Sequence, residues 1–501
     1  MIPERAARRA GLVAGLLTLA GAALTLNRML VGVFYDDGLY VGIAYALSHG
    51  LGYVHPHLPG HPAAVHYPPL YPLVLAPFFG LLSVPTAALA AKMLNAVFAA
   101  LGAGLIAWHA SRSELLGPGA PSWLAVAMVV AAALALPTLS ILTVLFSEPL
   151  FALLVAIAVI VADRPPQRWP PAWGALAAGG AAALALLTRS IGVAAGVGVV
   201  LFLVLVRRAP WCHAALVAAP VVAAALAWGW WVLRHRGGID PAMATNYGSY
   251  FEVVHQAGLG LFWASLSDLP RPLGALTLSW LPSALYYVFG ATALTVLLYG
   301  LVLLARRSSI GFTLLGYFAI LAVWPFPSDR FIWVVLPWLG LAWAAAARDL
   351  ARRQTLRLAV ALVAAAIVVG YGQLEVRGLG GRLWSVASGT TSATAARMLP
   401  GLATLPPNAV IAADAEALVW LYTGRTTVPF YVYSYRGRHI VYPPPAEQRA
   451  YLERQGVTHI MIGGYGGTSA AELDALLGAY PGWITMAQGW PGGGAVFRVK
   501  P

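Results

Sequence analysis

The chain of 501 residues is 60% hydrophobic and only 10% charged, so it carries more apolar surface than the core of a soluble protein could bury. Its net charge of +13 comes almost entirely from arginine, and in so apolar a chain the positive-inside bias explains this excess, which excludes nucleic acid as the expected partner. The single cysteine, Cys212, excludes an internal disulfide. The composition therefore predicts a polytopic α-helical protein embedded in membrane lipids.

About eleven membrane-spanning helices are predicted, because a span needs roughly 20 mostly apolar residues. The first begins after Arg5, Arg8 and Arg9 and resembles a signal peptide, but its apolar run continues to about Val33 without a small-residue cleavage site, so we expect it to be retained. The predicted helices cover residues 10–32, 86–110, 121–140, 145–162, 172–188, 190–206, 212–233, 279–305, 310–325, 331–347 and 358–372.

The distribution of arginine predicts the orientation of these helices. If the N-terminus is cytoplasmic, alternation places every dense arginine cluster on the cytoplasmic side, as the positive-inside rule requires. These clusters are Arg112, Arg164 with Arg168, Arg207 with Arg208, Arg306 with Arg307, and the run from Arg348 to Arg357. The loop 34–85, the segment 234–278 and the C-terminal tail then lie outside. The excess of Arg over Lys and the many alanines suggest a high-GC bacterium, in which this protein would lie in the inner membrane and face the periplasm.

A change of pattern near residue 373 predicts a second domain. NAVIAADAEALVWLYTGRTTVPF predicts strand, helix and strand, GVTHIMIGG predicts a buried strand, AELDALLGAY a short helix and AVFRVK a closing strand. We therefore expect a transmembrane catalytic domain over residues 1–372 and an extracytoplasmic α/β domain over 373–501.

Two adjacent carboxylates, Asp36 and Asp37, follow the first predicted span in FYDDGLYVGIAYALSHGLGY. A charged pair at a helix end beside water can also be a solvated loop, and that alternative stays open. The stretch after the pair is amphipathic and is expected to lie along the membrane surface, and the prolines of HYPPLYPLVLAPFF fix a turn before another interfacial helix. Such a loop can hold a carboxylate rigidly at the bilayer boundary.

The pattern D-D-x-x-Y after the first span, followed by a histidine-rich loop and Y-P-P-L-Y-P, resembles the first external loop of GT-C fold glycosyltransferases. The families it resembles are the protein O-mannosyltransferase-like and lipid A aminoarabinose transferase-like enzymes. In those families the first acid of the pair is the catalytic carboxylate, which implies this role for Asp36. Here the second acid is Asp37 where Glu is commoner, and His66 stands where the aminoarabinose transferases carry a lysine, so the donor sugar is not identified.

The resemblance extends along most of the chain. LFSEPLFALL, with Glu148, resembles the acidic start of the fourth helix of these enzymes, and LLTRSIG, with Arg189, the end of the fifth. DRFIWVVLP, with Arg330, resembles a late R-[FY]-hydrophobic-P motif, and LVWLYTGR, at 418–425, a segment of the C-terminal domains. The predicted orientation places Glu148, Arg189 and Arg330 at external helix ends, where an ionisable residue at membrane depth indicates function. A dipole-favoured acid at a helix start and snorkelling arginines are the alternatives.

This location predicts the chemistry. The cytoplasmic loops are too short to fold into a nucleotide-sugar domain, and no Gly-rich phosphate loop is present, so we expect a sugar donor carried on a polyprenyl phosphate. Asp36 would act as base on an acceptor hydroxyl that attacks the anomeric carbon with inversion. Arg189 and Arg330 would bind the donor phosphate, which guanidinium groups contact in a bidentate manner.

Further candidates complete the predicted site. Asp37 and Glu148 are candidate catalytic residues together with Asp36. Glu148 would orient the acceptor or a cation. The segment 234–278, which contains Tyr247, is long for a loop and predicts a lid over the site or a flexible connector. The candidate substrate-binding residues are His66, Tyr67, Tyr40 and Tyr247.

A divalent cation is the one cofactor that the sequence suggests. Imidazole and carboxylate groups can together bind Zn²⁺ or Mn²⁺, and Asp36, His55 and His57 are the candidate ligands. The spacing of the loop histidines matches no strong metal motif, and solvated histidines are the alternative.

The predicted function is therefore glycosyl transfer at the external face, to a lipid, glycan or protein acceptor. A transporter is the alternative from another class, but the internal symmetry of the paired halves typical of transporters is not found, and the acids lie at one face. A lipid-linked polysaccharide polymerase or ligase is the second alternative, and it would favour a large late external loop over an acid pair in the first one.

Overall fold

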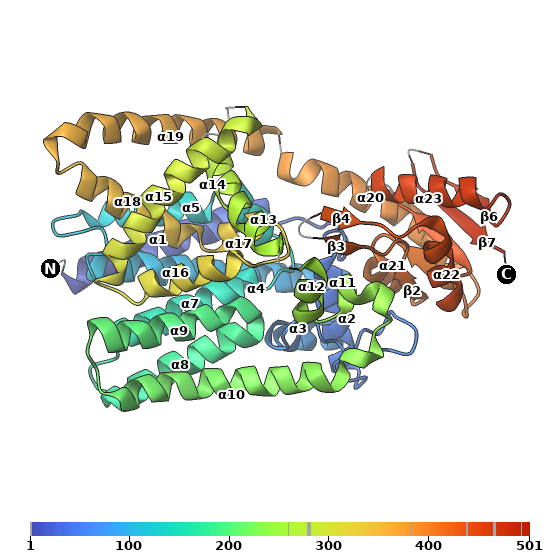
Figure 1. The fold of residues 1–501 in the computed structure, drawn as a ribbon, viewed down its shortest axis with the longest axis horizontal. Helices are drawn as coiled ribbons and strands as arrows, with labels where there is room; N and C mark the ends of the chain where they lie inside the picture. Colours follow the sequence, from blue (N-terminus) through green and yellow to red (C-terminus); the bar gives the residue numbers. More distant parts are fainter. Residues whose placement is uncertain are drawn as a thin grey trace.

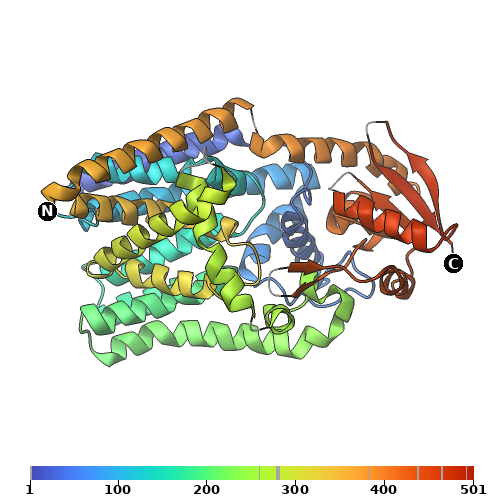
Figure 2. The same cartoon turned by 45° about the horizontal axis from the view of Figure 1, so that its top comes forward.

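The computed structural model describes residues 3–258, 260–277, 282–381, 383–436, 439–463, 467–491 and 493–500. A helical body forms one end of the molecule and a small sheet domain the other, with the N-terminus and the C-terminus at opposite extremes (Figure 1). The helices of the first predicted external loop lie between the body and the sheet domain, which a second view confirms (Figure 2). This loop therefore sits at the junction of the two parts.

The helical part of the chain runs from α1 to α20. Its first half comprises α1 Glu4–Thr25, α2 Asp36–Ser48, α3 Leu70–Leu81, α4 Val84–Arg112, α5 Ser122–Ala133, α6 Leu136–Leu142, α7 Glu148–Asp163, α8 Pro171–Thr188, η1 Ser190–Gly192, α9 Val193–Leu201, η2 Phe202–Val206 and α10 Trp211–His235. Its second half comprises η3 Arg236–Gly238, η4 Pro241–Met243, α11 Ala244–Tyr247, α12 Tyr250–Ala257, α13 Gly260–Asp268, α14 Pro270–Thr277, η5 Ser283–Leu285, α15 Tyr286–Ala305, α16 Ile310–Leu321, α17 Asp329–Val334, α18 Leu336–Leu350, α19 Gln354–Gly381 and α20 Leu383–Ala403.

The predicted number of eleven spans stays a prediction. Among the described residues six helices are long and apolar enough to cross a membrane, and the pair α5 and α6, bent by 64°, would make a seventh. The other predicted segments contain shorter helices, such as α7 with 16 residues and α16 with 12. Pro337 in the first turn of α18 separates it from α17, because proline cannot continue a helix that precedes it. Residues 279–281 of the predicted helix 279–305 lie outside the described part of the chain.

Small residues let the helices of the body approach closely. A Cβ atom on Gly11 of α1 would lie 2.8 Å from the carbonyl oxygen of Gly104 of α4, so this crossing requires glycine. Other side chains of α1 face outward, since Leu12 is 64% and Leu16 56% exposed. Exposed leucines on a long apolar helix are suited to contact with lipid.

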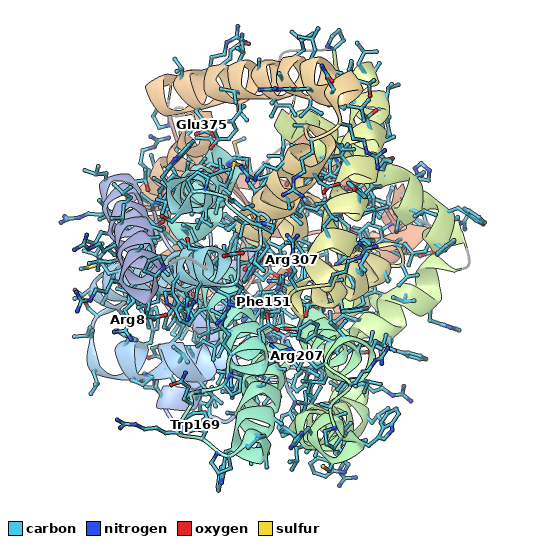
Figure 3. All side chains as sticks on the ribbon, turned by 90° about the vertical axis from the view of Figure 1, so that its left-hand side faces the viewer. Arg8, Phe151, Trp169, Arg207, Arg307 and Glu375 are labelled. Atoms are coloured by element: carbon cyan, nitrogen blue, oxygen red, sulfur yellow. The ribbon has the colours of Figure 1, made fainter. Side chains whose placement is uncertain are left out.

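The end of the body that carries the N-terminus is rich in arginine. Figure 3 looks at this end and labels Arg8, Arg207 and Arg307 on it. Arg112, at the end of α4, pairs with Glu4 at 2.9 Å, and Arg307 donates to the carbonyl oxygen of Leu115 at 3.1 Å. The predicted cytoplasmic clusters therefore gather at the end opposite the sheet domain, as the predicted orientation requires.

The sheet domain contains the strands and helices that its sequence predicts. Its elements are β1 Val410–Ala413, α21 Glu416–Thr423, β2 Thr426–Pro429, β3 Ser434–Arg436, β4 His439–Val441, α22 Pro445–Arg454, β5 His459–Ile462, α23 Gly467–Ala479, β6 Ile484–Gly489 and β7 Ala495–Val499. The strand order is β2-β1-β5-β7-β6, with β1 parallel to β2 and β5, and β7 antiparallel to its two neighbours. Strands β3 and β4 form a separate antiparallel pair.

The sheet domain packs directly on the first external loop. Gly32, with a φ of +94°, lies so close to α21 that an added Cβ would be 2.6 Å from the Cβ of Leu418. The amide of Thr427 in β2 donates to the carbonyl of His57 at 2.8 Å. Helix α2 is buried, with Leu39 and Ile43 both 0% exposed, and the expectation that it lies along the membrane surface stays a prediction.

Candidate active site

The first residue of α2 is Asp36, and the backbone before it is strained. Tyr35 has a φ of 65°, in the left-handed region that a bulky residue rarely adopts. The turn brings Asp36 to the N-terminus of α2, where the helix dipole favours a negative charge. Strain of this kind persists where surrounding contacts hold it, and it often marks a functional site.

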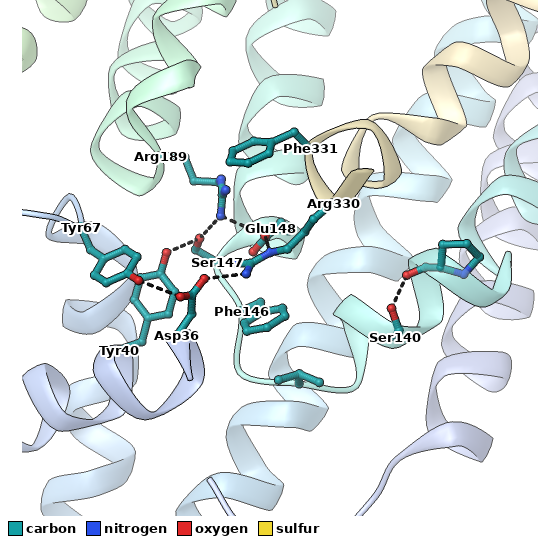
Figure 4. Close-up of polar contacts among 12 residues, drawn as sticks. Asp36, Tyr40, Tyr67, Ser140, Phe146, Ser147, Glu148, Arg189, Arg330 and Phe331 are labelled. Carbon is teal, nitrogen blue, oxygen red and sulfur yellow. Dashed lines mark hydrogen bonds and ion pairs between the residues drawn. The ribbon is translucent and has the colours of Figure 1, made fainter. Parts of the chain in front are cut away.

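Two side chains hold the carboxylate of Asp36 (Figure 4). The hydroxyl of Tyr67 donates to Oδ1 at 2.8 Å, and Nη1 of Arg330 contacts Oδ2 at 2.5 Å. The Asp36 side chain is 24% exposed, so both partners leave it accessible. Burial raises the pKa of Asp36, but the charge of Arg330 and the Tyr67 hydrogen bond outweigh burial and hold that pKa below its ordinary value.

Arg330 joins Asp36 to a second carboxylate, Glu148 (Figure 4). Nε of Arg330 binds Oε1 of Glu148, and Nη1 of Arg189 lies 3.0 Å from the same oxygen. Arg189 also donates to Oγ of Ser147 at 3.1 Å, and the hydroxyl of Tyr40 shares a hydrogen bond of 2.9 Å with that oxygen. Residues far apart in the chain thus form one continuous network of two acids and two guanidinium groups.

Aromatic rings fix both guanidinium groups in place. The Arg330 guanidinium lies over the ring of Phe146 at 3.8 Å from its centroid, and that of Arg189 lies over Phe331 at 4.8 Å. Such stacking suits arginine because its planar charge is weakly hydrated. Phe146 precedes the Ser147–Glu148 pair and Phe331 follows Arg330, so each local motif supplies both a polar group and a ring.

Asp37 points away from this network. Its Oδ2 accepts from the amide of Gly32 at 2.9 Å and its Oδ1 from the amide of Phe34 at 3.1 Å. The residue is 2% exposed. Asp37 therefore ties down the strained turn before α2, and the structure does not bring its carboxylate to the other candidate residues.

The segment 234–278 folds over the site as short helices. Nδ1 of His66 hydrogen bonds to the carbonyl of Gly248 at 2.7 Å, and its ring packs against Tyr250 at 4.5 Å between centroids. A capping box of Ser249 and Glu252 fixes the start of α12 next to these contacts. The described residues of this segment form short helices that contact His66 beside the site, and its role as a lid or as a flexible connector stays a prediction.

A second polar cluster joins this segment to the sheet domain. Oε1 of Glu416, the first residue of α21, accepts from the hydroxyl of Tyr247 and, at 2.9 Å, from that of Tyr35. Nε2 of His57 contacts the Tyr247 hydroxyl at 2.9 Å, and Asn246 donates to the Tyr35 hydroxyl at 2.9 Å. Burial raises the pKa of Glu416 to about 7. Tyr247 thus lies in this cluster, next to the site and not within its charged network.

The candidate cation site of Asp36, His55 and His57 is not assembled. Among the described residues no three His, Cys, Asp or Glu side chains converge in a way that could hold a metal ion. Asp36 is bound by Arg330 and Tyr67, whereas the rings of His55 and His57 pack around Tyr247. A guanidinium on each acid of the network repels a cation, so the residues present do not fit a divalent metal.

Several residues of the site could not be identified from the sequence. Ser147 stands beside Glu148 in a quoted motif, yet only the fold brings it to Tyr40 and Arg189. Glu416 lies in an ordinary amphipathic helix of another domain, and its burial against Tyr35 and Tyr247 leaves no local signal.

Solved structures show which fold this architecture represents. ArnT from Cupriavidus metallidurans, in the apo state, is 14% identical, covers 97% of each chain and has a TM-score of 0.54. The Archaeoglobus fulgidus oligosaccharyltransferase in complex with Zn and sulfate is 14% identical, with a TM-score of 0.55 over 98% of this chain and 73% of that one. The same organism's AglB, in complex with an inhibitory peptide and a dolichol-phosphate, is 12% identical, with a TM-score of 0.51 over 90% of this chain and 69% of that one.

No protein-family model matches the chain, and no curated protein matches it by sequence. The fold is therefore established by the solved structures, whose likeness extends over nearly the whole chain. The chain has the GT-C fold of integral-membrane glycosyltransferases.

Proposed function

We propose that the protein transfers a sugar from a polyprenyl-phosphate donor to an acceptor hydroxyl at the extracytoplasmic face of the inner membrane. The observation that supports this most is the network in which Arg330 joins Asp36 to Glu148 and Arg189. It combines an accessible carboxylate with two positive groups at the end of the body next to the sheet domain. The likeness to an oligosaccharyltransferase described with a dolichol-phosphate supports a lipid-linked donor.

Asp36 is proposed as the base of an inverting displacement. The acceptor oxygen attacks the anomeric carbon, the bond between that carbon and the phosphate oxygen breaks, and the acceptor proton passes to Asp36. The phosphate leaves with the bonding electron pair, and because it is already a good leaving group no paired acid is needed. The low pKa of Asp36 keeps the carboxylate ionised and ready to accept the proton.

Arg330 and Arg189 are proposed to bind the phosphate of the donor. Arg330 is 25% exposed on its side chain and so remains within reach of a ligand, whereas Glu148 is buried behind it at 1%. Glu148 holds both guanidinium groups toward one point, where their planar donors can contact phosphate oxygens. His66, Tyr67, Tyr40 and Tyr250 surround this point and are proposed to shape the sugar pocket.

The arrangement also supports different roles for the helical body and the sheet domain. The helical body, with residues up to about 372, supplies every charged group of the network, and the sheet domain covers the loop that holds Asp36. The arginine-rich end is proposed to face the cytoplasm and the sheet domain the periplasm. The acceptor is a lipid, a glycan or a protein side chain.

A donor panel tests this proposal. Purified protein would be offered radiolabelled sugars on polyprenyl phosphate and, separately, the same sugars as nucleotide donors, with extracted envelope material as acceptor. We expect label transfer from a lipid donor only. Arg189→Lys, which keeps the charge but loses the bidentate contact, is expected to raise the donor KM roughly tenfold. Transfer from a nucleotide sugar would contradict the proposal. So would folded protein that transfers no label from any of the donors.

A further inference from the structure

A cleft lies where the sheet domain meets the segment 234–278, outside the charged network. Its volume is about 430 Å³, within the roughly 300–1,000 Å³ of small-molecule sites. One wall comes from the β3–β4 pair and α22, the other from η4 and α11. The side chains that give it chemical character are Tyr433, Tyr442, Ser434, Thr245, Glu447 and Arg454.

Polar contacts tie the two walls together beside the cleft. Asp240, just before η4, accepts from the side chain of Gln455 at 2.8 Å and lies 3.8 Å from Nε of Arg454. On the sheet side the rings of Tyr433 and Tyr442 pack at 6.3 Å between centroids. The sheet domain and the segment 234–278 therefore both fix the shape of the cleft. Packing between the tyrosine rings holds its aromatic wall in place.

An aromatic path connects this cleft to Asp36. Tyr433 packs against Tyr435 at 5.8 Å and Tyr435 against Phe326 at 5.7 Å. Phe326 contacts His66 at 6.2 Å, and His66 contacts Tyr67, the residue that donates to Asp36. Burial, the neighbouring tyrosines and the negative charge of Asp36 together raise the pKa of Tyr433.

We propose that this cleft is the acceptor subsite of the transferase and that it binds a saccharide. The proposal rests on the glycosyl transfer proposed above. Half-buried tyrosine rings offer flat apolar faces that match the C–H faces of a sugar ring, and their hydroxyls suit its polar edge. Glu447 supplies two acceptor oxygens and Arg454 a fork of donors, a combination that matches neighbouring hydroxyl groups. The acceptor would therefore be a glycan whose sugar ring stacks on these tyrosines.

Charge and geometry favour a saccharide over the other acceptors. Glu447 and Arg454 together carry no net charge, whereas an acidic headgroup would call for an excess of positive side chains. The cleft is lined by residues of both the sheet domain and the segment 234–278, so a ligand in it contacts two walls, unlike a peptide strand that is added to one sheet edge. A neutral or weakly charged glycan fits both features.

Saccharide binding, measured apart from transfer, tests the proposal. Detergent-solubilised full-length protein would be probed by saturation-transfer difference NMR with a panel of hexose and pentose di- to tetrasaccharides. We expect at least one member to bind wild type and Asp36→Asn with equal affinity. Tyr442→Ala is expected to weaken binding roughly tenfold through loss of stacking, and Tyr442→Phe to restore it. Glu447→Gln should weaken binding, while Glu453→Gln on the same helix should not.

The outcomes separate this inference from the proposed function. Three results would each overturn the saccharide subsite. The first is that folded protein binds no saccharide, and the second is that wild type, Tyr442→Ala and Glu447→Gln bind equally well. The third is that an extended peptide competes with the saccharide. If saccharide binding is lost in Tyr442→Ala but no lipid donor supports transfer, the proposal of a saccharide subsite stands and the proposed transferase function is overturned. Melting temperatures of the variants within a few degrees of wild type exclude loss of binding through unfolding.

Discussion

Two neighbouring acids in this chain have different environments, and their hydrogen bonds explain why. Asp36 is held by side chains, Tyr67 and Arg330, and stays partly exposed. Asp37 is held by the backbone amides of Gly32 and Phe34 and is buried. From the sequence both acids are equally good candidates, and the resemblance alone favours the first. The partners of Asp36 support its proposed role as the base, whereas those of Asp37 hold the turn before α2.

The Tyr67 hydrogen bond predicts a change in the pH dependence of activity. A base must be ionised to act, so a pKa held below the ordinary value keeps Asp36 active at lower pH. Tyr67→Phe removes one of the contacts that favour the charged form, so the acid limb of kcat/KM should move to higher pH. Tyr71→Phe, whose hydroxyl binds Asn95 instead, should leave the limb in place. An unmoved limb in Tyr67→Phe would mean that this residue does not tune the base.

At the scale of elements, the docking of α21 on the first external loop determines the shape of the site. Tyr35 and Tyr247 both donate to Glu416, so the strained turn before α2, the segment 234–278 and the sheet domain meet at one carboxyl group. The sequence predicts α21 and the strands beside it correctly, because local periodicity determines them. It does not predict where α21 docks, because that depends on long-range contacts such as Leu418 against Gly32.

The raised pKa of Glu416 predicts that this docking depends on pH. A folded-state pKa of about 7, above the ordinary 4.5, means that the contribution of Glu416 to stability is present below the ordinary value. It is lost as pH rises through about 7, and a shift of this size corresponds to roughly 3 kcal/mol. The groups that face Glu416 are Tyr35, Tyr247 and Asp414, and His57 contacts the hydroxyl of Tyr247.

Thermal unfolding at a series of pH values measures this effect. Wild type should lose stability between about pH 5 and about pH 8, and Glu416→Gln, which is neutral throughout, should lose clearly less. Asp474→Asn, an exposed acid on α23, should follow wild type. Equal pH slopes for wild type and Glu416→Gln would show that Glu416 ionises without cost in the folded protein.

At the scale of the whole molecule, composition and periodicity are sufficient to predict a membrane helical protein with a small sheet domain. They fail where helices are short or bent. Helices α5 and α6 look like one span in the sequence, yet Pro137 in the first turn of α6 divides them. The convergence of Arg189, Arg330 and Glu148 could be inferred only as a shared face, because no local pattern encodes contacts as distant in the chain as that between Arg330 and Glu148, 182 positions apart.

The fold as a whole is more similar to solved structures than the sequence is. Solved GT-C structures share this architecture at 14% identity, so the arrangement of helices is retained where the sequence is not. The same fold supports several acceptors, and fold alone therefore does not identify the substrate. We propose that Asp36, the accessible acid at the junction, performs the chemistry.

The measurement that tests this claim most directly is the initial rate of sugar transfer by purified wild type and Asp36→Asn, with the donor identified by the panel. Asparagine keeps the shape of the side chain but cannot accept the proton, so we expect the rate to fall at least about a hundredfold while the protein stays folded and still binds donor. Turnover near that of the wild type would contradict the account and place the base elsewhere.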